Sequence, residues 1–248
     1  MSWASRAGVA VLLACALLQM AGVVAGPVLT AATETIPQWA RLPGTLLLVL
    51  YAVLGWLSRQ GGARRYAGLI AGGMLFGHLG DLAMGGVIPS PDGWLAGMLL
   101  FGLGHGFYIA AFVSLGRSIG SGEQAMALAL VLGQAVGVVV WYALTANSGR
   151  GPVMEYGALL YALVICCMAA LAVVLTIREP RLRPLACGAL LFLMSDILLG
   201  LSAFRGVGGA LWNDLIWVIY ISGQALLVTS VARAAVVSPG PRTPGSSR

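Results

Sequence analysis

Eight long apolar stretches divide this chain, and short segments rich in glycine, proline and arginine separate them. Each stretch is about 17–25 residues long, the length that an α-helix needs to cross the hydrocarbon core of a bilayer. Membrane β-strands would instead alternate polar and apolar residues over ~10 positions, which this sequence does not do. Only 9% of the residues are charged, against about 25% in a typical soluble domain. The sequence therefore predicts an all-α integral membrane protein.

We expect a single bundle of eight transmembrane helices over residues 1–236, followed by a disordered tail over 237–248 that is rich in proline, glycine and serine. The first apolar run is too long for a typical signal peptide, so we count it as a span. Glycines recur at helical spacing in GLIAGGMLFGHLG and FGLGHG, which permits close contact between helices. The expected helices cover residues 8–29, 42–58, 66–87, 93–116, 125–146, 153–177, 184–204 and 211–234.

Arginine alone supplies the basic charge, because the chain contains no lysine. With eight spans both termini lie on one side, and eleven of the 14 arginines fall on that side. The other three are Arg41, Arg150 and Arg205. Since cytoplasmic loops carry the excess of basic residues, we expect cytoplasmic termini and a bacterial inner-membrane location. The arginines form no single stripe, which argues against a nucleic-acid partner.

Two aspartates, Asp81 and Asp196, lie inside apolar stretches, whereas the other six of the 8 acidic residues fall at segment ends or in loops. A charged group in hydrocarbon is costly, and such residues usually mark a functional site. Two carboxyl groups that share an apolar site can hold one proton between them, which leaves one acid and one base. We therefore predict that these aspartates are a catalytic acid/base pair, with the individual roles open.

Several polar side chains share the expected depth of the aspartates. His105 falls near the middle of the fourth helix, and Tyr220 and Gln224 near the middle of the eighth. Tyr108 follows His105 by three positions and therefore lies on the same helix face. We expect these four side chains to position water or the polar part of a substrate, with interhelical hydrogen bonding as the alternative.

Three further candidates lie beside the aspartates or at a helix end. His78 precedes Asp81 by three positions and shares its helix face. Ser195 adjoins Asp196 but should point elsewhere on the helix, and no GxSxG nucleophile motif surrounds it. Both are candidates for positioning. Arg41 starts the second helix and is a candidate for binding a lipid phosphate, because arginine binds phosphate in bidentate fashion; interfacial snorkelling is the alternative.

Four motifs between residues 41 and 224 carry a family resemblance. The first is Gly80-Asp81 in a glycine-rich helix, and the second is GMLLFGLGHGFYIAAF, which contains Gly97, Phe101, His105, Tyr108 and Phe112. The third is GALLFLMSD, which ends in Ser195-Asp196, and the fourth is the pair Tyr220 and Gln224. Together they resemble the YhhN family of membrane proteins, which includes the lysoplasmalogenases. The chain departs from the family pattern at Gly77, where a serine is usual.

The resemblance implies an activity: hydrolysis of the vinyl ether bond of a lysoplasmalogen to a fatty aldehyde and a glycerophospho-alcohol. It implies that Asp81 and Asp196 are the catalytic pair and that the partners are a lysophospholipid substrate and the surrounding membrane lipid. This chemistry requires no metal, nucleophile or cofactor.

Three other functions are compatible with two aspartates inside a membrane. A transporter would use them as a proton or cation relay, and would favour inverted repeats, of which none is evident. A metal-dependent lipid hydrolase would bind zinc through His78, His105, Asp81 and Asp196, although no HExxH motif is present. A structural membrane protein would use the aspartates only as polar contacts between helices.

Overall fold

The computed structural model describes residues 3–30 and 36–237, and these residues hold eight helices that are long and apolar enough to cross a membrane. No strand occurs in the described part of the chain. The predicted all-α class is therefore confirmed, as are eight helices of membrane-spanning length and composition. The tail predicted over 237–248 lies outside the described residues, except for Val237. The helices are α1 (Trp3–Thr30), α2 (Gln38–Leu57), α3 (Gly61–Met84), α4 (Gly93–Ser118), α5 (Glu123–Thr145), α6 (Pro152–Arg178), α7 (Arg183–Arg205) and α8 (Ala210–Val237), with a short 3-10 helix, η1 (Pro180–Leu182), before α7.

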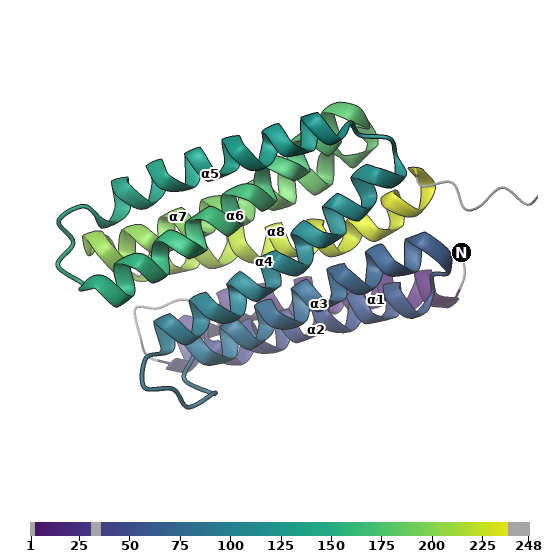
Figure 1. Cartoon of the computed structure of the whole chain (residues 1–248). Helices are drawn as coiled ribbons and strands as arrows, with labels where there is room; N and C mark the ends of the chain where they lie inside the picture. The colour runs from purple at the N-terminus through teal and green to yellow at the C-terminus, as the bar shows by residue number, and fades with distance from the viewer. Residues whose placement is uncertain (1–2, 31–35, 238–248) are drawn as a thin grey trace, which may run out of the picture.

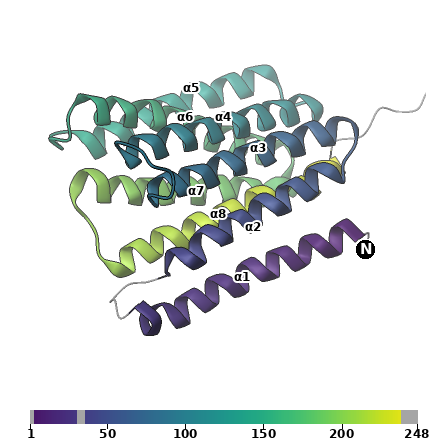
Figure 2. The same ribbon diagram turned by 90° about the horizontal axis from the view of Figure 1, so that it is seen from below.

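The helices run side by side as a bundle (Figure 1). Figure 2 shows α1 at one edge of the bundle next to α2, with α5 at the opposite edge. Helix α3 packs against α4, and α7 packs against α8. Helix α8 also contacts α2 and α3, and α6 contacts α4 and α7. Segments far apart in the sequence are thereby brought together in the middle of the bundle.

Three helices begin four or more residues earlier than the apolar pattern predicts, and the first of them, α1, begins at Trp3, five residues before the expected start. Helix α2 begins at Gln38 and α3 at Gly61, four and five residues before the expected starts. Their first turns contain polar residues such as Arg64, so each helix continues beyond the apolar stretch that sets a membrane span. Helix α3 ends at Met84, three residues early, because Gly85 and Gly86 follow and Gly86 has a φ of 73°.

Glycine allows the central helices to approach closely, as the sequence predicts. A Cβ atom added to Gly73 of α3 would lie 2.3 Å from the Tyr108 ring of α4. A Cβ atom at Gly104 would lie 2.9 Å from the carbonyl oxygen of Gly73, and one at Gly188 would lie 2.9 Å from that of Gly223. Helices α3 and α4, and likewise α7 and α8, therefore meet at their backbones. Short polar side chains can then reach across these contacts.

Candidate active site

A cavity of about 390 Å³ lies between five helices, at the end of the bundle where α2, α4 and α8 begin and α3 and α7 end. Its wall mixes apolar residues with charged and polar ones, and we call it the polar cavity. Asp81 of α3 and Asp196 of α7 both line this cavity, and both side chains are half-buried. Arg41, Ser195 and Tyr220 line it as well. The structure therefore places both intramembrane aspartates on one cavity.

Asp81 ends a chain of three hydrogen bonds that crosses the bundle. The Tyr220 hydroxyl donates to Oδ2 of Asp81 at 2.9 Å. The Gln224 amide nitrogen donates to the Tyr220 oxygen at 3.3 Å, and the Tyr108 hydroxyl donates to Gln224 Oε1 at 2.8 Å. Tyr108 and Gln224 have no exposed surface and lie behind the cavity wall. Helices α4, α8 and α3 thus together orient this carboxyl group.

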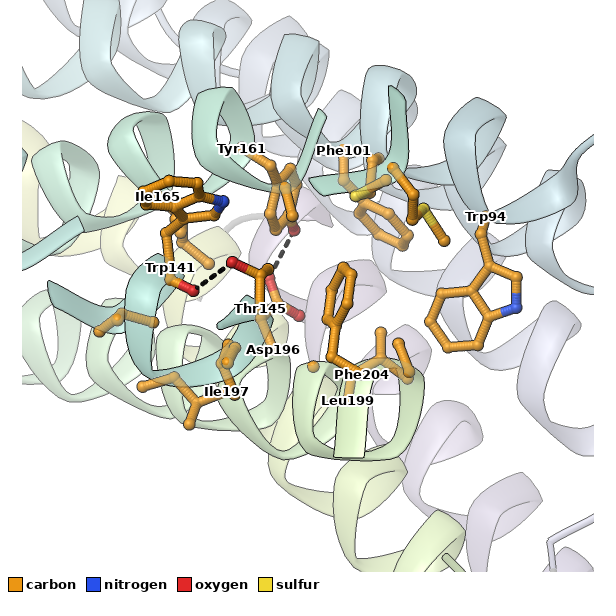
Figure 3. Close-up of a pocket in the computed structure, with 18 of the residues that line it drawn as sticks. Trp94, Phe101, Trp141, Thr145, Tyr161, Ile165, Asp196, Ile197, Leu199 and Phe204 are labelled. Atoms are coloured by element: carbon orange, nitrogen blue, oxygen red, sulfur yellow. Dashed lines mark hydrogen bonds between the residues drawn. The ribbon is translucent and has the colours of Figure 1, made fainter. Parts of the chain in front are cut away.

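Asp196 ends a second chain. The Tyr161 hydroxyl of α6 donates to Oδ2 of Asp196 at 2.5 Å, the contact marked in Figure 3. The Nε2 atom of His105 lies 3.0 Å from the Tyr161 oxygen and 3.8 Å from Oδ2 of Asp196. His105 is fully buried. Helices α4 and α6 therefore fix this carboxyl group on α7.

Sequence reasoning does not identify Tyr161, although it makes the shortest contact to either aspartate. A single tyrosine within the apolar run ALLYALV is also typical of an aromatic residue that packs in a core or at a membrane interface. The available signal is weak: a tyrosine buried in an apolar helix usually finds a hydrogen-bond partner for its hydroxyl. Which partner it finds depends on how α6 is rotated against α7.

The expectation that Ser195 points away from Asp196 is wrong. Its side chain does not point away from the aspartate: it lines the cavity, and its Oγ atom lies 3.4 Å from Oδ1 of Asp196. The same Oγ donates a shorter hydrogen bond of 2.7 Å to the carbonyl oxygen of Phe192. Ser195 therefore stands beside the carboxyl group while its proton is directed to the helix backbone.

His78 lies apart from the cavity. Its Nδ1 atom is 2.8 Å from the Thr45 hydroxyl of α2, and it is not among the residues that line the cavity. Three positions advance an α-helix by about 300°, so the side chains of His78 and Asp81 diverge by about 60°. Thr45 of α2 is near both side chains, but only Asp81 reaches the cavity and Tyr220 of α8.

Arg41, in the first turn of α2, lines the polar cavity and is held by several contacts. Its guanidinium pairs with Asp214 at 3.2 Å and donates to the Ile36 carbonyl oxygen at 2.7 Å. It also lies over the Trp217 ring, 5.4 Å from the ring centre. Its side chain remains 24% exposed. The positive group is thus positioned and still accessible from the cavity.

A second cavity, of about 70 Å³, adjoins the first and is almost wholly apolar. Figure 3 shows its wall of aromatic and aliphatic side chains with Asp196 and Tyr161 among them. Five residues line both cavities: Met84, Trp94, Phe101, Asp196 and Leu199. Asp196 therefore stands where a polar space meets an apolar one.

The zinc arrangement considered from the sequence does not form. Within residues 3–30 and 36–237, no three His, Cys, Asp or Glu side chains come together as a group that could hold a metal ion. His78 is turned to Thr45, and His105 is directed to Tyr161. The two histidines therefore belong to different contacts.

A comparison with protein-family models matches residues 36–231 to the YhhN family. The chain belongs to the YhhN family. The match confirms the resemblance drawn from the sequence motifs and extends a few residues beyond 41–224 at both ends. It contains the two aspartates and every hydrogen-bond partner described above for this YhhN protein. No curated protein and no solved structure gives a significant match to the chain.

Proposed function

We propose that this YhhN protein is a membrane hydrolase that cleaves the vinyl ether bond of lysoplasmalogen-type lysophospholipids. The observation that supports this function best is the position of the two carboxyl groups, Asp81 and Asp196, on one polar cavity that meets an apolar cavity at Asp196. The vinyl ether of such a lipid lies between a polar glycerophosphate and a hydrocarbon chain. A junction of this kind suits that bond.

The proposed reaction begins with proton transfer from one carboxyl group to the β-carbon of the vinyl ether, which leaves an oxocarbenium ion. The second group, as a carboxylate, stabilises the cation and takes a proton from the water that adds to it, as paired carboxylates do in glycoside hydrolysis. The hemiacetal then collapses. The second carboxyl group returns its proton to the glycerol oxygen, and the first takes the hemiacetal hydroxyl proton. One water is consumed, and both aspartates regain their starting states.

The surrounding residues support this chemistry in the proposed site. His105, Tyr108 and Gln224 act from behind the cavity wall, through the tyrosines that touch the aspartates. Phe101 lines both cavities and lies 6.0 Å from the Tyr220 ring, measured between ring centres. Aromatic rings beside the cavity favour a cation. In the polar cavity, Arg41 binds the lipid phosphate.

The proposal is tested with purified protein and lysoplasmenyl lipid, by measuring released fatty aldehyde. The wild type should release aldehyde, and Asp81→Asn and Asp196→Asn should each lower the rate by about 10²–10⁴-fold, the usual range for a general acid or base. Asp92→Asn is the matched control. Asp92 caps α4 outside the membrane span by accepting from the Trp94 and Leu95 amides, and asparagine caps equally well.

Two outcomes would contradict the hydrolase proposal. One is an inactive wild type across vinyl ether lysolipids that differ in headgroup. The other is an active wild type whose two aspartate variants lose thermal stability but keep the rate, which is the behaviour of polar contacts between helices.

We also propose that both termini are cytoplasmic and that the protein lies in a bacterial inner membrane. Support comes from the arginines, eleven of which fall on the side of the termini when eight helices alternate in direction. The polar cavity is at the other end of the bundle, so a headgroup would enter from the periplasmic side. A fluorescent-protein fusion at residue 248 should be bright in cells, and an alkaline phosphatase fusion there should be inactive. An active phosphatase fusion would reverse the orientation.

A further inference from the structure

His105 determines the direction of the hydrogen bonds that end at Asp196. Its Nδ1 atom is buried and has no hydrogen-bond partner among the described residues. A buried N–H without an acceptor is rarer and more costly than a buried acceptor without a donor. The Nδ1 atom is therefore the unprotonated nitrogen of a neutral imidazole, and the proton is on Nε2. Nε2, which lies 3.0 Å from the Tyr161 oxygen, then donates to it.

Tyr161 has a single hydroxyl proton, so the direction continues to the aspartate. Because the Tyr161 oxygen accepts from His105, its proton goes to Oδ2 of Asp196. The separation of 2.5 Å lies in the range of a hydroxyl that donates to an ionised carboxylate, about 2.5–2.7 Å. The reverse direction, from a protonated Asp196 through Tyr161 to Nε2, would leave a buried N–H at Nδ1 without an acceptor.

Asp81 has the weaker set of partners. Tyr220 donates to its Oδ2 at 2.9 Å, the length of an ordinary hydrogen bond. Thr45 is also near, but its one proton is directed to the Leu42 carbonyl oxygen at 3.1 Å or to His78 Nδ1 at 2.8 Å. The positive charge of Arg41 is shared with Asp214 at 3.2 Å. A carboxylate inside an apolar bundle is costly by itself, and two on one cavity also repel each other, so the carboxyl group with the weaker partners takes a proton.

From this asymmetry we infer that Asp81 carries the proton and that Tyr161 is the positioning residue that keeps Asp196 ionised. The inference rests on the proposed function for its catalytic meaning, because it divides the roles of that reaction. Asp81 protonates the β-carbon. Asp196, where the two cavities meet, stabilises the cation and activates water.

The protonation states can be measured without substrate, so this test is independent of the hydrolase proposal. The carbonyl stretch of a neutral carboxylic acid is separate from carboxylate bands in the infrared spectrum and shifts in deuterated water. With the protein in detergent free of ester groups, the wild type at neutral pH should show one such band. Asp81→Asn should remove the band, and Asp196→Asn should retain it. A band that survives Asp81→Asn and disappears in Asp196→Asn, or no band in the wild type, would overturn the assignment.

Tyr161→Phe tests the positioning role and keeps the ring. Without the hydrogen bond from Tyr161, Asp196 should be able to take up a proton, so a second carboxylic acid band should appear in the infrared spectrum. The double variant, Tyr161→Phe with Asp196→Asn, should lack this second band. Tyr220→Phe is the control, because this tyrosine touches Asp81 and not Asp196. It should shift the existing band without adding a second component. A Tyr161→Phe protein with the spectrum of the wild type would overturn the role of Tyr161.

Discussion

The Tyr220 hydroxyl lies 2.9 Å from Oδ2 of Asp81, which joins α8 to α3 inside the bundle. Tyr220 in turn accepts from Gln224, and Gln224 accepts from Tyr108. The amide nitrogen of Gln224 can only donate, so the Tyr220 proton is directed to the aspartate. The carboxyl group is thus oriented by a chain of partners and not by one contact.

Tyr220→Phe should lower kcat by about tenfold, which is ~1.4 kcal/mol of transition-state stabilisation, and leave KM nearly unchanged. The loss of one buried hydrogen bond should also lower the free energy of unfolding by about 0.5–1.5 kcal/mol. Tyr66→Phe is the matched control, since Tyr66 joins the same two helices by a 2.8 Å bond to Ser230 away from the polar cavity. It should lose similar stability and keep its rate. Equal losses of rate in the two variants would mean that Tyr220 contributes to stability only and does not orient Asp81 for catalysis.

Arg41→Met should raise KM for a lysophospholipid by about tenfold or more, because a charged hydrogen bond contributes about 1.5–3 kcal/mol. A substrate with the same vinyl ether chain on plain glycerol has no phosphate and should show no change in KM. Asp214→Asn removes the partner of Arg41 but leaves the guanidinium, so it should retain phosphate binding. Steady-state kinetics on both substrates give the answer. An equal rise in KM for both substrates would mean that Arg41 supports the structure of the site and does not bind phosphate.

Ala158→Leu should shift the preference of the proposed hydrolase toward lipids with shorter chains. Ala158 lines the apolar cavity on α6, and the added methyl groups would occupy part of its space. The measurement is kcat/KM over a series of chain lengths. Ala127→Leu, at an exposed position on α5, is the control and should leave the profile unchanged. If kcat/KM depends on lipid chain length in Ala158→Leu as it does in the wild type, the lipid chain does not occupy this cavity.

Gly73→Ala should lower the melting temperature, because its Cβ would lie 2.3 Å from the buried Tyr108 ring. Overpacking of this kind costs about 1–3 kcal/mol. Gly106→Ala, on the neighbouring helix, has no atom within 4 Å of the added Cβ and should be neutral. Thermal unfolding in detergent distinguishes the two variants. Equal melting temperatures would mean that α3 and α4 separate easily at this contact.

The fold follows from the sequence because apolar length and loop composition determine where helices can cross a membrane. Both aspartates could be found the same way, since a carboxyl group inside an apolar run is rare. The starts of α2 and α3 could not, because polar first turns continue a helix beyond its apolar stretch.

The contacts of the site depend on the rotation of each helix, which its own sequence leaves open. Arg41 and Asp214 are 173 positions apart, and nothing local to either predicts their ion pair. His78 and Asp81 share a helix face by spacing, yet His78 is turned to Thr45. Tyr161 acquires its role only because α6 packs beside α7 with its hydroxyl toward Asp196.

The most direct test of the account is mass spectrometry of the products formed from lysoplasmenyl lipid in deuterated water, with the aldehyde reduced at once to an alcohol to prevent later exchange. Protonation of the β-carbon by a carboxyl group that has exchanged its proton with the solvent predicts one deuterium on the carbon next to the former aldehyde. Aldehyde without carbon-bound deuterium, or no aldehyde at all, would contradict acid/base cleavage of a vinyl ether by Asp81 and Asp196.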